Sequence, residues 1–301
     1  MARILLTGAS GCVGSYALEQ LSQRHEVFAL TRHPDRVRQR KPAETVTLIE
    51  GDLNTLLTQY SALLATVDHC VHPATVWGGQ DIFQVNVKQT LALFQALSPR
   101  RCQSIHYFST ASLLDGKHQL FSQALTQGTD YIRSKACAHE SIRQFSGVPV
   151  HVYYPTVIFG GSPHHGSTPV SEFLPQLKQH LRWVKWLQAE AYFHWIHAQD
   201  IAHILDFRIR ENKPAEALVL GNPAYSVTQL QQELLRHYQQ KPAPFQMRLE
   251  RLLPILLPLL ARQMSPWDRF SLRHRHLRYQ VVNTQNYGLP SLATRIQDLL
   301  E

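Results

Sequence analysis

Short apolar runs alternate with longer amphipathic stretches over about the first 160 residues. The candidate strands are rich in β-branched and aromatic residues: Arg3–Leu6, Glu26–Thr31, Thr45–Ile49, His69–His72, Ser104–Phe108 and Val148–Tyr153. Between them, apolar residues recur every three or four positions, as in Ser15–Arg24 and Asn86–Ala96, which is typical of helices. This alternation predicts an α/β fold with a doubly wound parallel sheet. The carboxyl ends of its strands then share one edge, where ligands of such sheets bind.

The pattern changes after Pro155. Residues 160–169 (GGSPHHGSTP) have the Gly, Pro and Ser content of a loop. Two later apolar runs, Trp195–Leu205 and Leu218–Leu220, are candidates to return to the sheet, and residues 223–301 are helix-patterned but interrupted by prolines. We therefore expect a domain built around the sheet, residues 1–160 and 194–222, and a smaller, mostly helical C-terminal lobe, residues 161–193 and 223–301.

Composition narrows the class of protein. With 44% apolar and 17% charged residues, the 301-residue chain is globular rather than disordered or collagen-like. Its four cysteines form no C-x-x-C pair, which predicts a reduced, cytoplasmic protein rather than a disulfide or zinc scaffold. The opening MARILLTG lacks the apolar core of a signal peptide. The longest apolar stretch, residues 252–261, is too short for a bilayer, so we expect no membrane span.

The net charge does not by itself identify a partner. Thirty Lys and Arg residues against 22 Asp and Glu give a formal charge of +8, which leaves nucleic acid, an anionic membrane surface or a phosphorylated ligand open. No nucleic-acid partner is expected, since the sequence shows no face that combines basic with aromatic residues. The basic run DRFSLRHRHLRY (268–279) is interpreted as a solvated face, with an anionic carrier or a phosphate as the alternative ligand.

A glycine-rich turn joins the first predicted strand to the first helix. In TGASGCVG, Gly8 permits a tight turn, Gly11 a close approach to a phosphate, and Gly14 close packing of helix on strand. The helix amino terminus would present free N–H groups and the positive end of its dipole to an anion. A glycine triplet alone also fits an ordinary turn. Its place in an alternating βα chain favours a dinucleotide site.

Two arginines follow the second predicted strand. Where an NAD-binding chain would carry Asp or Glu for the ribose hydroxyls, this sequence reads TRHPDR, with Arg32 in the acidic position and Arg36 one turn later. A guanidinium can bind the 2′-phosphate that a carboxylate would repel. We therefore expect NADP(H) to be preferred over NAD(H). The alternative is that these are ordinary solvated arginines.

One helix carries a tyrosine and a lysine on the same face. Tyr131 and Lys135 stand four residues apart in DYIRSKACAHESIRQF, just before the sixth predicted strand. A free tyrosine has a pKa of about 10, and a nearby ammonium group lowers it, which suits acid–base chemistry near neutral pH. The pair is therefore a candidate catalytic pair, and the alternative is an exposed helix face.

Several motifs occur in the order typical of one family. They are TGASGCVG at 7–14, GDL at 51–53, Asn86 opening a helix, YIRSK at 131–135, PTVIFG at 155–160 and HAQDIA at 197–202. In this combination the chain resembles the extended short-chain dehydrogenase/reductase family, which includes NAD(P)-dependent epimerases and dehydratases. The resemblance covers residues 1–222 closely and 223–301 loosely. It implies a Rossmann domain that binds the dinucleotide and a lobe that binds the substrate.

The resemblance also implies a role for each matching position. The cofactor would be held at Gly8, Ser10, Gly11, Cys12, Val13, Gly14, Asp52, Leu53, Pro73, Ala74, Pro155 and Val157. Tyr131 would be the catalytic acid–base, and Lys135 would bind the nicotinamide ribose and lower the pKa of the tyrosine. No metal is implied despite the 17 histidines, and HAQDIA is interpreted as structural, with Asp200 capping a helix.

The sequence departs from the family at one catalytic position. The fifth strand of the family ends in a turn whose third hydroxyl polarises the substrate carbonyl, but in FSTASLLDG that position is Ala111. Thr110 or Ser112 would supply the hydroxyl after a small shift of the turn. Alternatively Tyr131 acts alone, and the loss of one such donor costs about 10²–10³ in turnover.

The segment after the sixth strand bears on the substrate. Members that act on nucleotide sugars tend to carry an asparagine there, whereas YYPTVIFGGSPHHGS has none and is similar to the reductase and hydroxysteroid dehydrogenase branches. We expect an NADP(H)-dependent oxidoreductase acting on the carbonyl, or the matching alcohol, of a small apolar substrate. The alternatives are a nucleotide-sugar epimerase or dehydratase and a non-catalytic NADP(H)-binding sensor. A homodimer is common in the family.

Overall fold

A seven-stranded parallel sheet forms the centre of the molecule. The computed structural model describes residues 1–40, 42–173, 176–251 and 264–299. The strand order is β11-β6-β5-β4-β1-β2-β3, with the strands at Arg3–Leu6 (β1), Glu26–Thr31 (β2), Val46–Glu50 (β3), His69–His72 (β4), Ser104–Phe108 (β5), Val150–Pro155 (β6) and Ala217–Leu220 (β11). All six pairings are parallel, which confirms the predicted doubly wound α/β class. The strand order reverses between β1 and β4, the point at which such sheets bind ligands.

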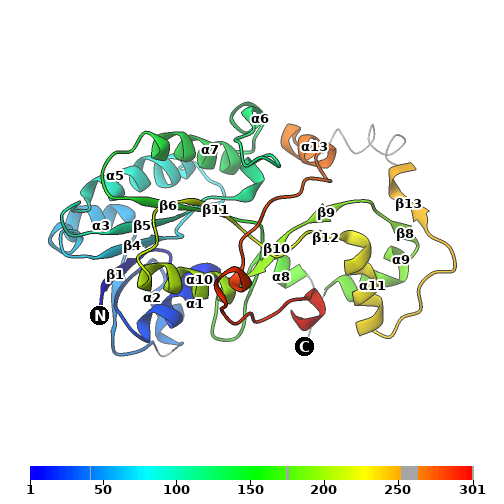
Figure 1. The fold of residues 1–301 in the computed structure, drawn as a ribbon, viewed down its shortest axis with the longest axis horizontal. Helices are drawn as coiled ribbons and strands as arrows, with labels where there is room; N and C mark the ends of the chain where they lie inside the picture. The colour runs from blue at the N-terminus through cyan, green and yellow to red at the C-terminus, as the bar shows by residue number, and fades with distance from the viewer. Residues whose placement is uncertain (41, 174–175, 252–263, 300–301) are drawn as a thin grey trace.

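Helices cover both faces of this sheet (Figure 1). On one face, α1 (Cys12–Ser22) and α10 (Ala198–Arg210) pack on each other and on a core that includes Ile4, Leu6 and Val71. On the other, α3 (Leu53–Gln59), α5 (Thr90–Ala96) and α7 (Asp130–Arg143) enclose a second core. Shorter elements complete the domain: α2 (Pro34–Arg38), α4 (Ser61–Leu64), α6 (Ser122–Thr126), the π-helical turn η1 (Gln84–Gln89) and the 3₁₀ turn η2 (Ala111–Leu113).

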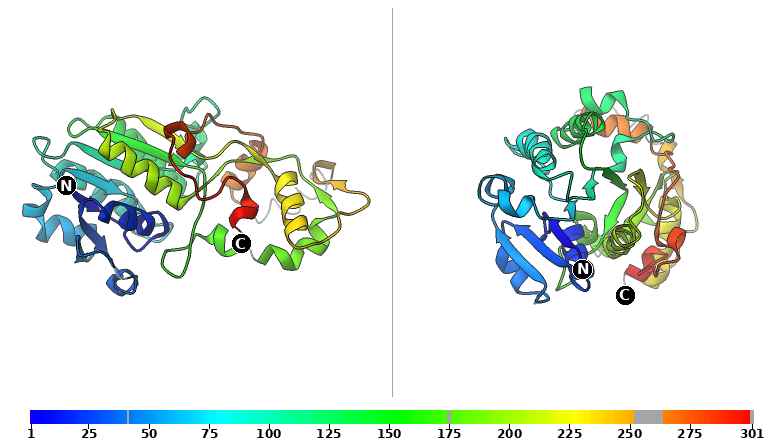
Figure 2. Two further views of the ribbon diagram at one scale, coloured as in Figure 1. Left: turned by 60° about the horizontal axis from the view of Figure 1, so that its bottom comes forward. Right: turned by 60° about the vertical axis from the view of Figure 1, so that its left-hand side comes forward.

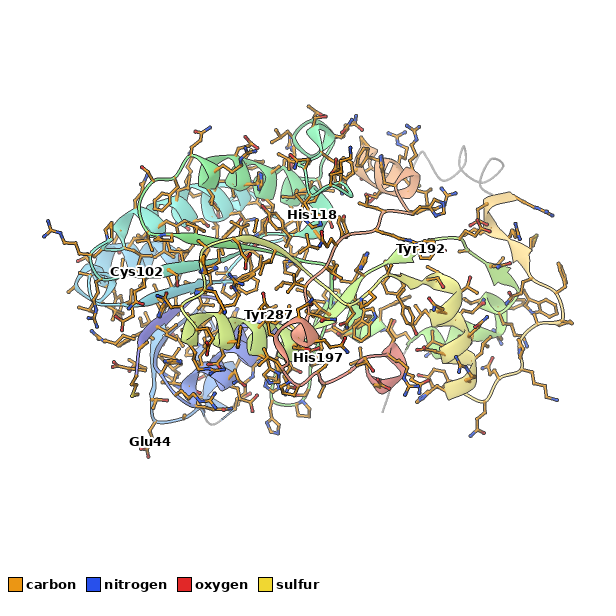
Figure 3. The ribbon with its side chains drawn as sticks, viewed as in Figure 1. Glu44, Cys102, His118, Tyr192, His197 and Tyr287 are labelled. Carbon is orange, nitrogen blue, oxygen red and sulfur yellow. The ribbon has the colours of Figure 1, made fainter. Side chains whose placement is uncertain are left out.

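Most strand predictions agree with the structure. Four strands have the predicted bounds, β3 and β6 are shifted by one or two residues, and Leu218–Leu220 does return to the sheet in β11. The prediction for Trp195–Leu205 is wrong. Only β10 (Trp195–His197) is a strand, and it pairs with β7 (Val157–Phe159) outside the main sheet before the chain enters α10. Helix spacing takes over after His197, whose Nδ1 accepts a hydrogen bond from the Gln199 amide at 3.2 Å (Figure 3).

The lobe extends from the carboxyl edge of the sheet, as Figure 1 and both views of Figure 2 show. Besides helices it contains two short strand pairs. Its elements are α8 (Pro169–Phe173), α9 (Leu177–Val184), β8 (Leu187–Gln188), β9 (Tyr192–Phe193), β12 (Tyr225–Ser226), α11 (Val227–His237), β13 (Met247–Arg248), α13 (Pro266–Arg273), η4 (Thr284–Tyr287) and η5 (Ile296–Leu299). The apolar stretch 252–261 lies outside the described residues.

Two general features bear on the sequence predictions. Within the described ranges, no helix is both long and apolar enough to cross a bilayer. All four cysteines are free thiols, and Cys70 and Cys102 are buried. Burial raises the pKa of Cys102 to about 12, so this thiol stays protonated and unreactive at neutral pH.

Candidate active site

The glycine turn between β1 and α1 has the geometry that its sequence predicts. Gly8 has a φ of +64°, and a Cβ there would lie 3.0 Å from the Ala74 backbone. A Cβ at Gly14 would lie 2.1 Å from the Gly8 carbonyl oxygen, so no larger residue fits. Gly11 is the N-cap of α1 and provides no side-chain cap, and the first turn carries no acidic residue. This helix end is therefore suited to an anion.

The loop after β7 packs on the same turn. The Gly166 amide donates to Ser15 Oγ at 3.1 Å, and a Cβ at Gly166 would lie 2.8 Å from the Cys12 backbone nitrogen. The His165 ring stacks on Tyr16 with centroids 3.7 Å apart, and its Nε2 lies 2.6 Å from a Glu19 carboxylate oxygen. Burial raises the pKa of the Cys12 thiol to about 12. The loop thus ties the start of the lobe to α1.

Arginines gather beside the glycine turn. Arg32 and Arg36 are exposed, at the end of β2 and on α2. Arg40, which the sequence analysis missed, is half-buried, and its Nη1 has no hydrogen-bond partner in the described part of the chain. Burial and the charge of Arg36 lower the pKa of Arg40, while its proximity to Cys12 opposes this. Because α2 ends at Arg38, Arg40 lies beyond the helix, and no helical spacing in the sequence marks it.

Two further predicted cofactor positions also hold the backbone together. Asp52 caps α3, because its Oδ1 accepts from the Thr55 amide at 2.9 Å and from the Thr55 hydroxyl at 3.1 Å. The hydrogen bond from the Thr55 amide is the main reason that the pKa of Asp52 lies below its usual value. Leu53 is buried at the start of that helix. The cap orients the loop after β3, so Asp52 has a structural role whether or not it contacts a ligand.

The segment after β4 lies next to the glycine turn. The Ala74 amide donates to Thr7 Oγ1 at 3.4 Å, and the same hydroxyl lies 2.8 Å from His72 Nδ1. Burial lowers the pKa of His72 to about 3, so its imidazole stays neutral. Asn86 fixes the other end: its Oδ1 accepts from the Val76 amide and its Nδ2 donates to the Val76 carbonyl, both at 2.9 Å. Residues 73–76 are thus held between β1 and η1.

Tyr131 and Lys135 lie on α7, facing this segment and the end of β5. The Lys135 ammonium donates to the Phe108 carbonyl oxygen at 2.8 Å and lies 5.0 Å from the Tyr107 ring centroid. Burial lowers the pKa of Lys135 to about 7. Burial also raises the pKa of Tyr131 above its usual value, the reverse of the lowering expected from the lysine. The ammonium group is directed at a backbone carbonyl, so desolvation decides the pKa of the tyrosine.

An exposed tryptophan covers the ring of Tyr131. The indole of Trp77 stacks on the phenol ring with centroids 4.3 Å apart and planes 18° apart, yet 72% of Trp77 is solvent-exposed. Its neighbours Gly78 and Gly79 have open space around them, and Gly79 has a φ of +97°. The backbone is therefore fixed before Trp77, at Val76, whereas Gly78 and Gly79 after it have open space around them. The sequence analysis missed it, because an aromatic residue in a loop carries no pattern.

In the turn after β5, the side chains of residues 109–112 differ in burial and in hydrogen bonding. Ala111 is buried among Leu113, Tyr154 and Trp267. Thr110 Oγ1 accepts from the Ser112 amide at 3.3 Å, so its own proton stays available to a substrate oxygen, whereas Ser112 is exposed. The buried Ser109 hydroxyl has no hydrogen-bond partner among the described residues.

Other predicted positions have structural partners. Pro155 ends β6, and Val157 pairs with Trp195 in the small β7–β10 sheet. Asp200 does not cap α10 as predicted, because His197 does. The buried Asp200 carboxylate instead accepts from the Leu292 amide at 2.9 Å and the Ser291 hydroxyl at 2.7 Å, and so anchors the C-terminal segment. In the described ranges, no three His, Cys, Asp or Glu side chains are placed to bind a metal ion.

A cavity of about 530 Å³ lies away from these residues. It lies between α7 and the strands β6 and β11, with His139, Arg143 and Tyr154 among its lining residues. The Tyr154 hydroxyl and His139 Nδ1 are 2.6 Å apart. Tyr131 and the glycine turn do not line this cavity. Residue chemistry rather than cavity size therefore identifies the candidate site.

Comparison with known proteins gives matches in sequence and in fold. The sequence model of the NAD dependent epimerase/dehydratase family matches residues 4–221. The crystal structure of gox2253 is 19% identical, with a TM-score of 0.71, over 93% of this chain and 89% of that one. MoeE5 in complex with UDP-glucose and NAD is 18% identical, with a TM-score of 0.65, over 99% and 96% of the two chains. The Bordetella bronchiseptica enzyme WbmH in complex with NAD⁺ is 19% identical, with a TM-score of 0.62, over 83% and 86%. These structures share the Rossmann-like fold of this chain.

A curated protein also matches part of the chain. The hybrid PKS-NRPS synthetase pvhA of Talaromyces variabilis is 28% identical over 180 residues, which are 53% of this chain. The chain spans about 4% of the length of that relative. The match therefore concerns one segment of a much longer protein.

Proposed function

Because the chain belongs to the NAD-dependent epimerase/dehydratase family, we propose that it is an NADP(H)-dependent oxidoreductase that reduces a carbonyl group or oxidises the matching alcohol. The observation that carries the proposal is the placement of Tyr131 and Lys135 on α7, beside the segment that packs on the glycine turn. An acid–base pair next to an anion-binding helix end is the arrangement that hydride transfer with proton transfer requires.

The residues around the glycine turn fit a dinucleotide phosphate. The uncapped amino end of α1, the close approach of Ala74 to Gly8 and the unpartnered Arg40 Nη1 all support this fit. The pyrophosphate would be held by Gly8, Ser10, Gly11, Cys12, Val13 and Gly14. Asp52 and Leu53 would contact the adenine. The remaining parts of the dinucleotide would contact Pro73, Ala74, Pro155 and Val157. Arg32, Arg36 and Arg40 would bind the 2′-phosphate. When bound, NADP(H) supplies or accepts the hydride.

The proton would come from Tyr131. Its raised pKa keeps the phenol protonated at neutral pH, so it is prepared to donate to a carbonyl oxygen, which favours reduction. Lys135 would hold the ribose and position the tyrosine. Thr110, whose proton is available, would orient the carbonyl, while Ser112 is less suited because it is exposed.

The substrate side supports a small apolar molecule. Trp77 stacks on Tyr131, and Leu113, Trp267 and Phe270 pack in the cluster that includes both Ala111 and Tyr131. We propose that residues 1–160 and 194–222 bind the dinucleotide and that residues 161–193 and 223–301 bind the substrate. An apolar surround of this kind selects against strongly hydrated substrates.

A nucleotide-sugar epimerase is the second candidate. It is favoured by the fold shared with MoeE5, whose complex contains UDP-glucose and NAD. The burial of Ala111 where the family has a hydroxyl favours a third candidate, a protein that binds NADP(H) without turnover. An epimerase retains its oxidised cofactor through turnover, whereas a sensor binds NADPH and consumes none.

Cofactor titration tests the first half of the proposal. NADPH is expected to bind more tightly than NADH, and Arg40→Met is expected to weaken NADPH binding about tenfold, the worth of one charge-assisted hydrogen bond. Arg38→Met is the matched control, because Arg38 lies two residues before Arg40, at the end of α2, but pairs with Asp35 at 3.1 Å. Equal affinity for NADH and NADPH would contradict the NADP(H) assignment.

Turnover tests the second half of the proposal, the reduction of a carbonyl group. Absorbance assays of NADPH consumption over a panel of apolar aldehydes and ketones are expected to give activity with at least one of them. Binding of NADPH with no consumption across the panel would support the sensor instead.

A further inference from the structure

Exposed apolar side chains concentrate in the lobe. Of the ten large apolar side chains exposed in the described residues, six lie in residues 170–186 and 245–247: Val170, Phe173, Trp183, Trp186, Phe245 and Met247. Trp183 and Phe245 are 64% and 65% exposed. Single exposed apolar residues are common, but a group of them marks an interaction surface. The name aromatic end is used here for Trp183, Trp186, Phe245 and Met247.

The aromatic end is a built surface. The rings of Trp186 and Phe245 are 6.1 Å apart at 61°, and the Met247 amide donates to the Trp186 carbonyl oxygen at 2.8 Å. The strands β8 and β13 pair directly beside it. Gln246 Nε2 donates to the Lys185 carbonyl oxygen at 3.0 Å, which joins the same two segments. Segments about sixty positions apart in the chain are thus held in one place.

Basic side chains alternate with these aromatic residues. Arg182 Cζ lies 5.3 Å from the Trp183 ring centroid, and Lys185 Nζ lies 5.9 Å from that of Trp186. No carboxylate in the described ranges forms an ion pair with Arg182 or Lys185. Nearby, Arg248 is 3.6 Å from a Glu190 oxygen, so its charge is partly balanced. The surface therefore combines apolar rings with two unpaired positive charges.

The aromatic end lies far from the sheet. In Figure 1, α9, β8 and β13 lie at the opposite end of the molecule from α3 and β4, and the left view of Figure 2 shows the same separation. A planar partner could therefore reach this end without contacting the Rossmann domain or Tyr131.

We propose that the aromatic end binds the surface of an anionic lipid bilayer. Tryptophan rings prefer the headgroup level, where one part of the ring is apolar and the N–H is hydrated. Each Lys or Arg near an anionic surface contributes an attraction of about fivefold in affinity. Because Trp residues alternate with unpaired cations, one surface provides both the preference of the rings for the headgroup level and the attraction to anionic lipid. The chain thereby attaches to the membrane by its lobe.

Vesicle sedimentation tests this proposal. The full-length protein is expected to sediment with vesicles of phosphatidylcholine and phosphatidylglycerol, less with phosphatidylcholine alone, and less as salt is added. Trp183→Ser combined with Phe245→Ser is expected to weaken binding at least about tenfold, since two large apolar side chains no longer leave water. Arg182→Gln combined with Lys185→Gln is expected to weaken it about 25-fold on the anionic vesicles alone.

Two controls make the test specific. Arg269→Gln combined with Arg273→Gln removes two cations from the groove between α6 and α13, and it is expected to leave vesicle binding unchanged. Arg182 is exposed and Lys185 half-buried, and no carboxylate of the described ranges pairs with either, so this charge variant keeps the test valid should the double serine variant fail to fold. The proposal is overturned if wild type does not sediment with anionic vesicles, or if the control weakens binding as much as Arg182→Gln with Lys185→Gln. It is also overturned if the wild-type chain forms a dimer that the serine variant dissociates, because the surface is then a protein interface.

Discussion

At the residue scale, burial rather than charge pairing sets the chemistry of the candidate catalytic pair. The spacing of Tyr131 and Lys135 could be read from the sequence, but the direction of the tyrosine's pKa shift could not. The direction of this shift depends on two contacts of the folded protein: the hydrogen bond of the Lys135 ammonium to the Phe108 carbonyl oxygen, and the stacking of Trp77 on the phenol ring. Arg40 was missed for the same reason. It is a candidate because its Nη1 is buried without a hydrogen-bond partner among the described residues, and burial is a property of the fold.

Lys135 gives a prediction about stability. Its pKa falls from about 10.5 in the unfolded chain to about 7 in the folded protein, so the unfolded chain binds more protons between these values. Stability therefore rises with pH across this window by about 1.4 kcal/mol per unit. Lys135→Met is expected to be more stable than wild type at pH 7, with the difference shrinking toward pH 10. Urea unfolding at several pH values checks this, and a constant difference would contradict it.

Trp77 gives a prediction about acid–base behaviour. Trp77→Ala is expected to expose the phenol ring of Tyr131 to water and so to bring its pKa down toward about 10. Ultraviolet titration of tyrosinate, with Tyr131→Phe subtracted to isolate the signal, measures the shift. Trp77→Phe keeps an aromatic cover and is the matched control. An unchanged titration in Trp77→Ala would show that the indole does not desolvate the tyrosine.

At the element scale, the strands and the glycine turn could be predicted because they depend on local patterns. Short apolar runs and glycine spacing give β1, β2, β4, β5 and α1 directly. The stretch Trp195–Leu205 could not be assigned, because a short apolar run looks alike in a strand and in a buried helix. The contact between residues 160–168 and α1 could not be predicted either, since it joins segments about 150 positions apart.

That contact gives a prediction for the loop. Gly166→Ala places a Cβ 2.8 Å from the Cys12 nitrogen, so the loop or the glycine turn has to move. We expect a loss of about 1–3 kcal/mol in stability and weaker NADPH binding, because the same turn would hold the phosphate. Gly78→Ala is the control, since nothing lies within 4 Å of its Cβ position. Thermal melting and NADPH titration measure both effects. Equal behaviour of the two variants would contradict the proposed role of the loop.

At the scale of the whole molecule, a network of polar side chains runs through the interior of the sheet. In the sequence, only the high number of histidines indicated it. His69 Nδ1 lies 2.8 Å from Ser104 Oγ, which lies 2.9 Å from His106 Nε2, and His106 Nδ1 lies 2.9 Å from the Tyr153 hydroxyl. His151 stacks on His106 and lies 3.1 Å from the buried Arg208. Burial keeps these imidazoles neutral, lowering the pKa of His69 and of His151 to about 4.

The network predicts acid sensitivity. A histidine with a pKa of about 6.5 in the unfolded chain and about 4 in the folded one binds a proton only on unfolding between these values. Stability is therefore lost as pH falls below about 6.5, by about 1.4 kcal/mol per unit for each such histidine. His69→Gln is expected to reduce this slope, whereas His33→Gln, at an exposed position, is expected to leave it unchanged. Urea unfolding between pH 7 and pH 5 measures the slopes, and equal slopes for His69→Gln and wild type would contradict the account.

The most direct test of the central claim follows a labelled hydride. With NADPH that carries deuterium at both C4 positions and the carbonyl compound that gives turnover, mass spectrometry is expected to find deuterium on the carbinol carbon of the product. Tyr131→Phe is expected to bind NADPH normally but to transfer the label at least about 10²-fold more slowly, the contribution of a positioned general acid. Transfer at the wild-type rate in Tyr131→Phe, or a product without the label, would contradict the proposed chemistry.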